Sequence, residues 1–440
     1  MRVAWLTVTP DPGSRQATAG SSIGASLYVL ALLTLLHTLS LTDRFLIAAF
    51  GTQISLDLGL SNQQFGFVTG LAFTLFYATT GPLAGLMVDR FGPGRLLGLG
   101  VLVWSAMTGL TGIAKSFTGL WLPRTLVGVG EAILIPAASK ILSARFDDRH
   151  SATVFGLFFM GGHLGVGLAY RLGGGQSFSG EPLVWREVFL GLGALGLCLG
   201  LLVWLSARWL GVASATAADA GDRASLPILV RTLMATLAES RRLQLALLGL
   251  ALVHVLYAGM QFLQIWLVQD KGLAPGEASA LYGRVHLMTA IPASLLGGIA
   301  ADQLARRLAV SRALFVAGVI LLCLPMIIVF RLSPADSPLF MPGMVISVFA
   351  FSFPYGAMIA LVVAEAPEAI RALVMAAALF LANVGVIGLG TVLLGAGADW
   401  MAAADMSAPM TRALLAADGL LLLAVLVFLL LHKAINRRRD

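Results

Sequence analysis

Twelve long apolar runs decide what this chain can fold into. Each run is about 20 residues long, which is the length of helix that crosses ~30 Å of hydrocarbon. Backbone polar groups in lipid must be satisfied within their own segment, so the runs are expected to be helices and the fold class an all-α membrane protein. We place the runs at about 25–50, 62–88, 95–114, 118–143, 151–172, 187–208, 243–269, 278–303, 311–331, 341–365, 370–396 and 409–432.

The composition agrees with this class. The 440-residue chain is 58% hydrophobic and only 12% charged, with a mean hydropathy of +0.90, which is too apolar for a soluble protein. Its net charge of +7 comes from arginines in the short loops between apolar runs. Such a distribution is a signal of membrane topology, so we expect no nucleic-acid partner.

The loop charges predict the orientation in the membrane. Basic residues gather on one side of the runs, at Arg90, Arg95, Arg145, Arg149, Arg306, Arg307 and Arg437 to Arg439. Because positively charged loops stay in the cytoplasm, both termini are expected to be cytoplasmic, which requires an even number of spans. The expected location is the bacterial inner membrane.

Polar stretches divide the chain into domains. Residues 1–22 are rich in Thr, Ser, Pro and Gly and are expected to form a disordered cytoplasmic tail. The longest polar interval, 211–240, is expected to be a cytoplasmic linker between two bundles of six helices, 23–210 and 241–432, and a basic tail follows at 433–440. Within the linker, Leu226 to Leu237 forms either an amphipathic helix on the inner membrane surface or a plain connection.

Four ionisable residues interrupt two neighbouring apolar runs. Asp43 and Arg44 lie in the first run, and Arg124 and Glu131 lie seven residues apart in the fourth. Seven residues make two helical turns, so the side chains of Arg124 and Glu131 point the same way. Charges at membrane depth cost several kcal/mol unless they are paired or hydrated, which favours a shared polar cavity. The alternative is a pair of static ion pairs that only fix helix packing.

The two halves carry a faint repeat. Gly85, Asp89 and Arg90 follow the second run, and Gly298, Asp302 and Arg306 follow the eighth, with four residues from glycine to acid in both. Repeated halves are typical of secondary transporters, which bind substrate between the halves near the bilayer midplane.

These residues resemble a known family. Gly85 to Arg95 is similar to the signature loop G-x-x-x-D-R-x-G-R-R of the major facilitator superfamily, except that Pro93 replaces the first basic residue. Residues 58–90, 124–132, 184–189 and 383–390 resemble its bacterial spinster-like branch. The resemblance implies two pseudo-symmetric six-helix bundles and alternating-access, proton-coupled transport of a lysophospholipid- or sphingolipid-like amphiphile. Pro136 is more like the organic anion:cation symporter branch, which leaves a small organic anion as the alternative substrate.

The resemblance also implies that Asp43 and Arg44 are the acid–arginine pair of the first helix, and that Arg124 and Glu131 are the pair of the fourth. Asp43 and Glu131 are expected to couple protons, because burial and a neighbouring arginine shift the pKa of a carboxyl group in opposite directions. Arg44 and Arg124 are expected to exchange partners and hold an anionic headgroup.

The signature loop has two readings. Its residues Gly85, Asp89, Arg90, Gly92 and Arg95 form a cytoplasmic gate or serve only as a positively charged membrane anchor. In the gate reading, Gly85 permits a close helix approach, and Asp89 accepts hydrogen bonds from a helix N-terminus across the two halves.

Other polar residues in the runs are weaker candidates. They line the cavity or pack as satisfied polar groups, and the sequence leaves both alternatives open. They are His163, Arg284 with His286, Tyr257, Gln261, Gln264 and Asn383.

Signals of enzyme or metal chemistry are missing from the sequence. It has no GxxxxGK[ST] loop and no His-x-x-x-His pair, and its two cysteines, Cys198 and Cys323, lie far apart in apolar runs. The glycines of GVGEA (128–132) are better explained as helix-packing positions. We therefore expect no enzymatic activity, no cofactor and no metal, and a monomer whose partners are a small anionic or amphiphilic substrate, protons and membrane lipids. A membrane receptor or enzyme without transport is the alternative of a different class.

Overall fold

The computed structural model describes residues 23–147, 150–175, 180–207, 226–308 and 310–436. Its elements are helices, which confirms the all-α fold class. The first half contains α1 (Ile23–Ala49), α2 (Gly51–Leu58), α3 (Asn62–Gly66), the π-helical segment η1 (Phe67–Leu71), α4 (Ala72–Phe91), α5 (Pro93–Gly112), α6 (Phe117–Glu131), α7 (Leu134–Arg145), α8 (Ser151–Gly173) and α9 (Trp185–Leu205). After α11 (Leu226–Glu239), the second half contains α12 (Arg241–Val253), α13 (Val255–Gln261), α14 (Leu263–Gln269), α15 (Pro275–Leu308), α16 (Arg312–Leu332), α17 (Phe340–Ser352), α18 (Tyr355–Glu365), η4 (Glu368–Ile370), α19 (Arg371–Phe380), the π-helical segment η5 (Leu381–Gly388), α20 (Leu389–Ala403), α21 (Pro409–Asp418) and α22 (Leu420–Asn436).

Within the described residues, twelve helices are long and apolar enough to cross a membrane, as predicted. Several of them combine consecutive elements; the second span, Asn62–Phe91, joins α3, η1 and α4. The chain is therefore an integral membrane protein. The last span runs to Asn436 rather than ending at residue 432, so the beginning of the expected basic tail is helical. The expected disordered tail, 1–22, lies outside the described residues.

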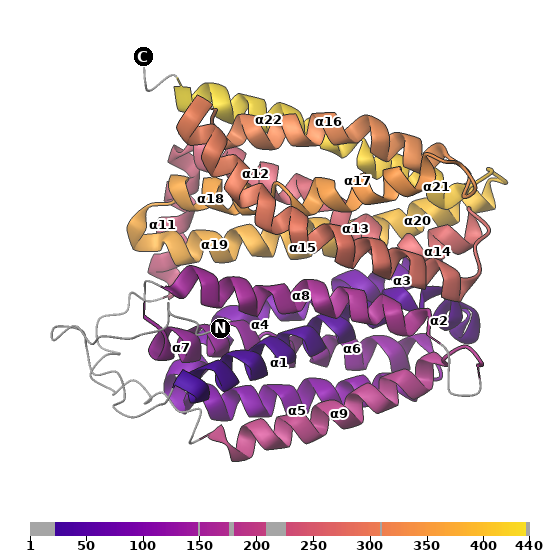
Figure 1. Cartoon of the computed structure of the whole chain (residues 1–440), viewed down its shortest axis with the longest axis horizontal. Helices are drawn as coiled ribbons and strands as arrows, with labels where there is room; N and C mark the ends of the chain where they lie inside the picture. Colours follow the sequence, from indigo (N-terminus) through magenta and orange to yellow (C-terminus); the bar gives the residue numbers. More distant parts are fainter. Residues whose placement is uncertain (1–22, 148–149, 176–179, 208–225, 309, 437–440) are drawn as a thin grey trace, which may run out of the picture.

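Six spans lie in each half of the chain. We call residues 23–205 the N-bundle and residues 241–436 the C-bundle. Figure 1 shows the C-bundle above the N-bundle, with α1 to α9 in indigo to magenta and α12 to α22 in warmer colours. The helix α11 covers the predicted amphipathic stretch, and its place on a membrane surface stays a prediction.

The two ends of the bundles differ in charge. One end carries Arg90 and Arg95, where α4 meets α5, and Arg145 at the end of α7; we call it the basic end (left in Figure 1). The other end carries α2, α14 and the end of α20, with Asp270 and Asp399, and we call it the opposite end.

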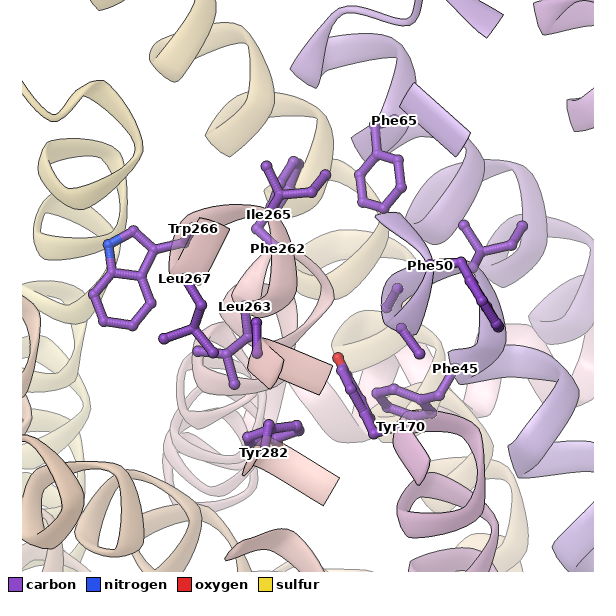
Figure 2. Packing of buried hydrophobic residues seen from close by; sticks show 14 of the residues in the cluster. Phe45, Phe50, Phe65, Tyr170, Phe262, Leu263, Ile265, Trp266, Leu267 and Tyr282 are labelled. Atoms are coloured by element: carbon purple, nitrogen blue, oxygen red, sulfur yellow. The ribbon is translucent and has the colours of Figure 1, made fainter. Parts of the chain in front are cut away.

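Apolar packing joins the bundles at only part of their length. One core lies wholly in the N-bundle and another wholly in the C-bundle, and both include residues toward the basic end, such as Val88 and Val374. A third core is shared by the bundles. Figure 2 shows some of its side chains, Phe45, Phe50, Phe65 and Tyr170 from the N-bundle with Phe262, Leu263, Ile265, Trp266, Leu267 and Tyr282 from the C-bundle. The apolar side chains of this shared core pack the two bundles against each other from the middle of the spans to the opposite end.

Glycine packing shows the same asymmetry. A Cβ atom at Gly66 would overlap the Thr391 carbonyl group of the other bundle, so only glycine permits this approach. On α4 toward the basic end, Gly81 and Gly85 have no described atom other than those of their chain neighbours and their own helix backbone within 4 Å of where a Cβ would lie. The close helix approach expected at Gly85 is absent from this conformation and stays a prediction for the state with the gate closed.

Candidate functional site

The structure brings the four ionisable residues together between α1 and α6. Arg44 Nη2 lies 2.8 Å from Glu131 Oε2, and Arg124 Nη1 lies 3.4 Å from Asp43 Oδ2. Each acid thus pairs with the arginine of the other helix. Arg124 also approaches the carbonyl oxygens of Asp43 and Arg44, both at 3.5 Å. The four residues form a crossed set of ion pairs, which we call the charge cluster.

A helix break fixes the position of Glu131. The helix α6 ends at Glu131, and α7 begins at Leu134, three residues later. Pro136 lacks the N–H that would bond to the Ala132 carbonyl, and its ring would clash with that carbonyl, so the helix is interrupted there. Just before the break, a Cβ at Gly128 would lie 2.6 Å from the Phe73 carbonyl oxygen, and one at Gly130 would lie 2.9 Å from that of Gly100. The glycines of GVGEA are packing positions, as predicted.

The charge cluster is almost fully buried. The exposed fractions of the side chains are 1% for Asp43, 14% for Arg44, and 0% for Arg124 and Glu131. Taking such charges out of water costs several kcal/mol per ion, so a buried cluster needs partners for most of its polar atoms. Yet Asp43 Oδ1, Glu131 Oε1 and the Nε atoms of both arginines have no hydrogen-bond partner among the described residues. The cluster therefore has spare capacity to bind a proton, water or an anion.

Aromatic rings form one wall of the charge cluster. The Arg44 guanidinium lies 4.4 Å from the centre of the Phe73 ring and 4.7 Å from that of Tyr77, and Arg124 lies 5.7 Å from the Phe73 ring. Such stacking stabilises a cation without neutralising it. Sequence reasoning missed Phe73 and Tyr77; their i, i+4 spacing on the second span was the available signal.

Tyr257 connects the cluster to the C-bundle. It lies on α13, its hydroxyl interacts electrostatically with the Arg44 guanidinium, and its ring centre lies 5.3 Å from that of Phe45. Of the weaker candidates, Tyr257 therefore lies beside the charge cluster, which fits the cavity-lining alternative. Arg44 thus pairs with Glu131 in its own bundle and interacts electrostatically with Tyr257 of the other.

The two glutamines of the seventh span differ in their surroundings. Gln264 Oε1 accepts hydrogen bonds from the Thr52 backbone N–H and hydroxyl, both at 2.9 Å, so it joins the two bundles. Gln261 is buried, and its Oε1 atom has no partner among the described residues. Gln264 thus fits the packing alternative, whereas Gln261 keeps both open.

The remaining candidates are scattered. His163 of α8 and His286 of α15 meet between the bundles with ring centres 5.7 Å apart. Asn383 lies in η5 and donates to the Leu379 carbonyl at 2.8 Å. Arg284 is exposed on the same stripe of α15 as Met288, away from His286. Arg284 therefore lies apart from the charge cluster.

The signature loop lies at the basic end. Asp89 Oδ1 is 2.8 Å from Lys140 Nζ of α7, in the same bundle. Gly92 links α4 to α5 with φ +86°, a conformation that favours glycine. Arg90 stacks over Phe91, and Arg95 is exposed. Lys140 was missed by sequence reasoning, although it is a lysine within the fourth apolar run. The gate role of the loop stays a prediction.

A second buried ion pair lies in the C-bundle. Arg331 Nε is 2.9 Å from Asp418 Oδ2, and the Arg331 guanidinium lies 5.0 Å from the Trp266 ring centre. Sequence reasoning missed it, although Asp418 is an acid within the twelfth apolar run. Both residues pack beside the shared core, far from α6 in the sequence, which favours a structural role.

We expect Asp418→Asn to destabilise the protein by about 2 kcal/mol, because a buried charged donor loses its partner charge. The measurement is thermal unfolding in detergent, with Asp336→Asn as the control, since Asp336 is exposed in a loop of the same bundle. An unchanged unfolding temperature for Asp418→Asn would contradict a stabilising role for this pair.

The chain is similar in sequence to known proteins. The family model of the Major Facilitator Superfamily matches residues 33–390. The chain is 28% identical over 285 residues to an MFS-type efflux pump of Mycolicibacterium smegmatis, which covers 63% of each protein. It is 28% identical over 190 residues to the hexuronate transporter of Escherichia coli, which covers 41% of each. The chain thus spans less than two thirds of the length of these curated relatives.

A solved structure has the same fold. The crystal structure of a bacterial homologue of the human lysosomal transporter spinster, inward-facing and unoccupied, superposes with a TM-score of 0.79 and 23% identity. The match covers 94% of this chain and 98% of that one. The resemblance to the spinster-like branch is confirmed at the level of fold, and the relatives are transporters rather than enzymes, as expected.

Proposed function

Because the chain belongs to the major facilitator superfamily, we propose that it is a proton-coupled transporter that carries an anionic amphiphile by alternating access. The substrate class is a lysophospholipid- or sphingolipid-like molecule. The observation that carries the proposal is the charge cluster, with two acids and two arginines buried between α1 and α6 beside an aromatic wall. The protein works as a monomer, and a proton gradient supplies the energy without a cofactor.

Proton binding changes which partner Arg44 holds. When Glu131 is ionised, its carboxylate forms an ion pair with Arg44, with 2.8 Å between Glu131 Oε2 and Arg44 Nη2. When Glu131 takes up a proton, that attraction falls, and the forked donors of the guanidinium become available to a phosphate or carboxylate group. Loss of the proton restores the ion pair and displaces the anion. Asp43 and Arg124 form the second such pair, with the longer distance of 3.4 Å.

The orientation follows from the charges of the two ends. The basic end faces the cytoplasm of a bacterial cell by the positive-inside rule, with both termini on that side. The shared core then closes the extracellular side, and the separate cores and open Gly81 and Gly85 lie on the cytoplasmic side. This supports an inward-facing conformation, the state named for the spinster homologue of similar fold.

Tyr257 offers a route by which the change passes between the bundles. It belongs to the C-bundle and interacts electrostatically with Arg44 of the N-bundle, so a shift of Arg44 toward or away from Glu131 alters an interaction between the moving parts. A proton bound in one bundle thereby influences how the two bundles pack.

We expect Tyr257→Phe to slow proton-driven transport by about fivefold, because the ring packing stays and only the interaction of the hydroxyl with Arg44 is lost. Substrate binding should change less, about twofold. The measurement is initial uptake rate against substrate concentration in proteoliposomes, with Tyr28→Phe as a control on the exposed part of α1. An equal loss in both variants would remove Tyr257 from the coupling mechanism.

Substrate class is tested by flux and competition. A fluorescent lysophospholipid should move across proteoliposome membranes faster when a pH gradient is imposed, and excess unlabelled lysophospholipid should compete. The second candidate is a small organic anion, favoured by the similarity to the hexuronate transporter. Competition by hexuronate but not by lysophospholipid would select the small organic anion. Flux that is the same with and without a pH gradient would contradict proton coupling for both substrate candidates.

A further inference from the structure

We propose that Asp399 is a latch that holds the opposite end closed by capping the first turn of the second span. The proposal concerns the conformational equilibrium of the two bundles and holds for any substrate. Asp399 lies on α20 of the C-bundle, and the second span, Asn62–Phe91, belongs to the N-bundle.

Three hydrogen bonds make the contact. Asp399 Oδ1 accepts from the backbone N–H of Asn62 at 3.1 Å and from Asn62 Nδ2 at 2.8 Å. Asp399 Oδ2 accepts from the backbone N–H of Gln63 at 2.8 Å. Both carboxylate oxygens are therefore used, and every donor comes from the other bundle.

The chemistry of a helix start makes this contact favourable. The first N–H groups of a helix have no acceptor within the helix, and the helix dipole adds partial positive charge at that point. The side chain of Ser61 accepts a hydrogen bond from the Gln64 N–H. The N–H groups of Asn62 and Gln63 are left for an acceptor outside the helix. Asp399 supplies that acceptor with a full negative charge.

The latch stands at the end of a tight seam between the second and eleventh spans. We define the seam by Asn62, Gly66 and Gly70 on one side and Thr391 and Gly395 on the other. A Cβ at Gly395 would overlap the Asn62 carbonyl, and a Cβ at Gly70 would overlap the Thr391 hydroxyl. Thr391 Oγ1 donates to the Gly66 carbonyl at 2.7 Å. Because the seam holds the backbones in direct contact, the carboxylate meets donors whose positions are already fixed.

The π-helical segments η1 and η5 lie in the seam or next to it. The segment η1 follows Gly66, η5 ends at Gly388, and the two segments pack against each other. A π-helical turn has weaker internal bonding than an α-helix and often marks a functional position in a helix. Opening this end therefore requires loss of the three Asp399 hydrogen bonds and separation of the spans at these segments.

A plain stabilising cap would have a different consequence. If Asp399 only stabilised the fold, its removal would lower the unfolding temperature and leave the two bundles in the same arrangement. A latch between bundles instead shifts the ratio of conformations, because the contact exists only while the opposite end is closed.

The test measures the distance between the bundles directly. Spin labels are attached to cysteines at Leu56 and Ala404, both exposed at the opposite end, after Cys198 and Cys323 are replaced by serine. Double electron–electron resonance on the full-length protein should show a long-distance population that rises about fivefold in Asp399→Ala relative to the parent protein. Asp336→Ala is the matched control, since it removes an exposed acid from the same end of the C-bundle.

A second variant removes the donor instead of the acceptor. Asn62→Pro deletes the Asn62 backbone N–H and its side-chain amide, and proline is tolerated at the first position of a helix, where Asn62 lies after the N-cap Ser61. It should raise the same long-distance population, and combining it with Asp399→Ala should add less than the sum of the separate changes. An unchanged distance distribution in both folded variants would overturn the latch. Since the measurement needs no substrate or proton gradient, its outcome is independent of the proposed transport function.

Discussion

Glu131→Gln is expected to lower proton-driven accumulation of substrate by about two orders of magnitude. Glutamine has nearly the shape of a protonated glutamate, but it neither releases a proton nor carries the charge that holds Arg44 at 2.8 Å. The variant therefore remains in the arrangement in which Arg44 is free to bind an anion. A hundredfold change in rate corresponds to about 2.7 kcal/mol. Loss of one member of a buried ion pair has an effect of comparable size.

Glu131→Gln should still exchange substrate across the membrane although it no longer accumulates substrate. In proteoliposomes with labelled substrate on one side and unlabelled substrate on the other, Glu131→Gln should still exchange the two, because exchange needs no net proton movement. Glu277→Gln is the control, since Glu277 is an exposed acid at the start of α15. Undiminished pH-driven accumulation in Glu131→Gln would remove Glu131 from proton coupling and leave the static ion-pair alternative standing.

The spans could be predicted from the sequence because a single physical requirement fixes them. A helix must contain about 20 apolar residues to cross the hydrocarbon, and that requirement is local in sequence. The charge cluster could be predicted as a group for a similar reason, since isolated charges at membrane depth are too costly to remain apart. Spacing within each run then showed that Arg124 and Glu131 share one face.

The choice of partners could not be predicted from the sequence. Asp43 and Arg44 are adjacent, yet each pairs with a residue of α6, because neighbouring residues on a helix point in different directions. Nor could the contact of Asp399 with Asn62 be predicted, since 337 positions separate the two residues and only the packing of the bundles unites them. The close approach expected at Gly85 stays a prediction, because a sequence encodes every state of a moving protein and this structure shows one of them.

Arg124→Gln is expected to abolish transport and also to destabilise the protein by about 3–5 kcal/mol. The substitution leaves the Asp43 carboxylate buried, with an exposed fraction of 1%, beside a neutral side chain. Removing one member of a buried ion pair has a cost of this size because the remaining charge is uncompensated. Thermal unfolding in detergent measures the stability, and pH-driven uptake in proteoliposomes measures the transport.

The double variant Asp43→Asn with Arg124→Gln separates structure from function. It removes both charges, so most of the lost stability should return, because no uncompensated buried charge remains. Transport should stay at least about 100-fold below that of the parent protein, since the site then lacks one proton-binding acid and one anion-binding arginine. Recovery of both stability and transport would mean that this pair only fixes the packing of α1 against α6. Recovery of stability alone would mean that the membrane-buried charges are kept for the transport step, at a cost to the fold that a neutral pair would avoid.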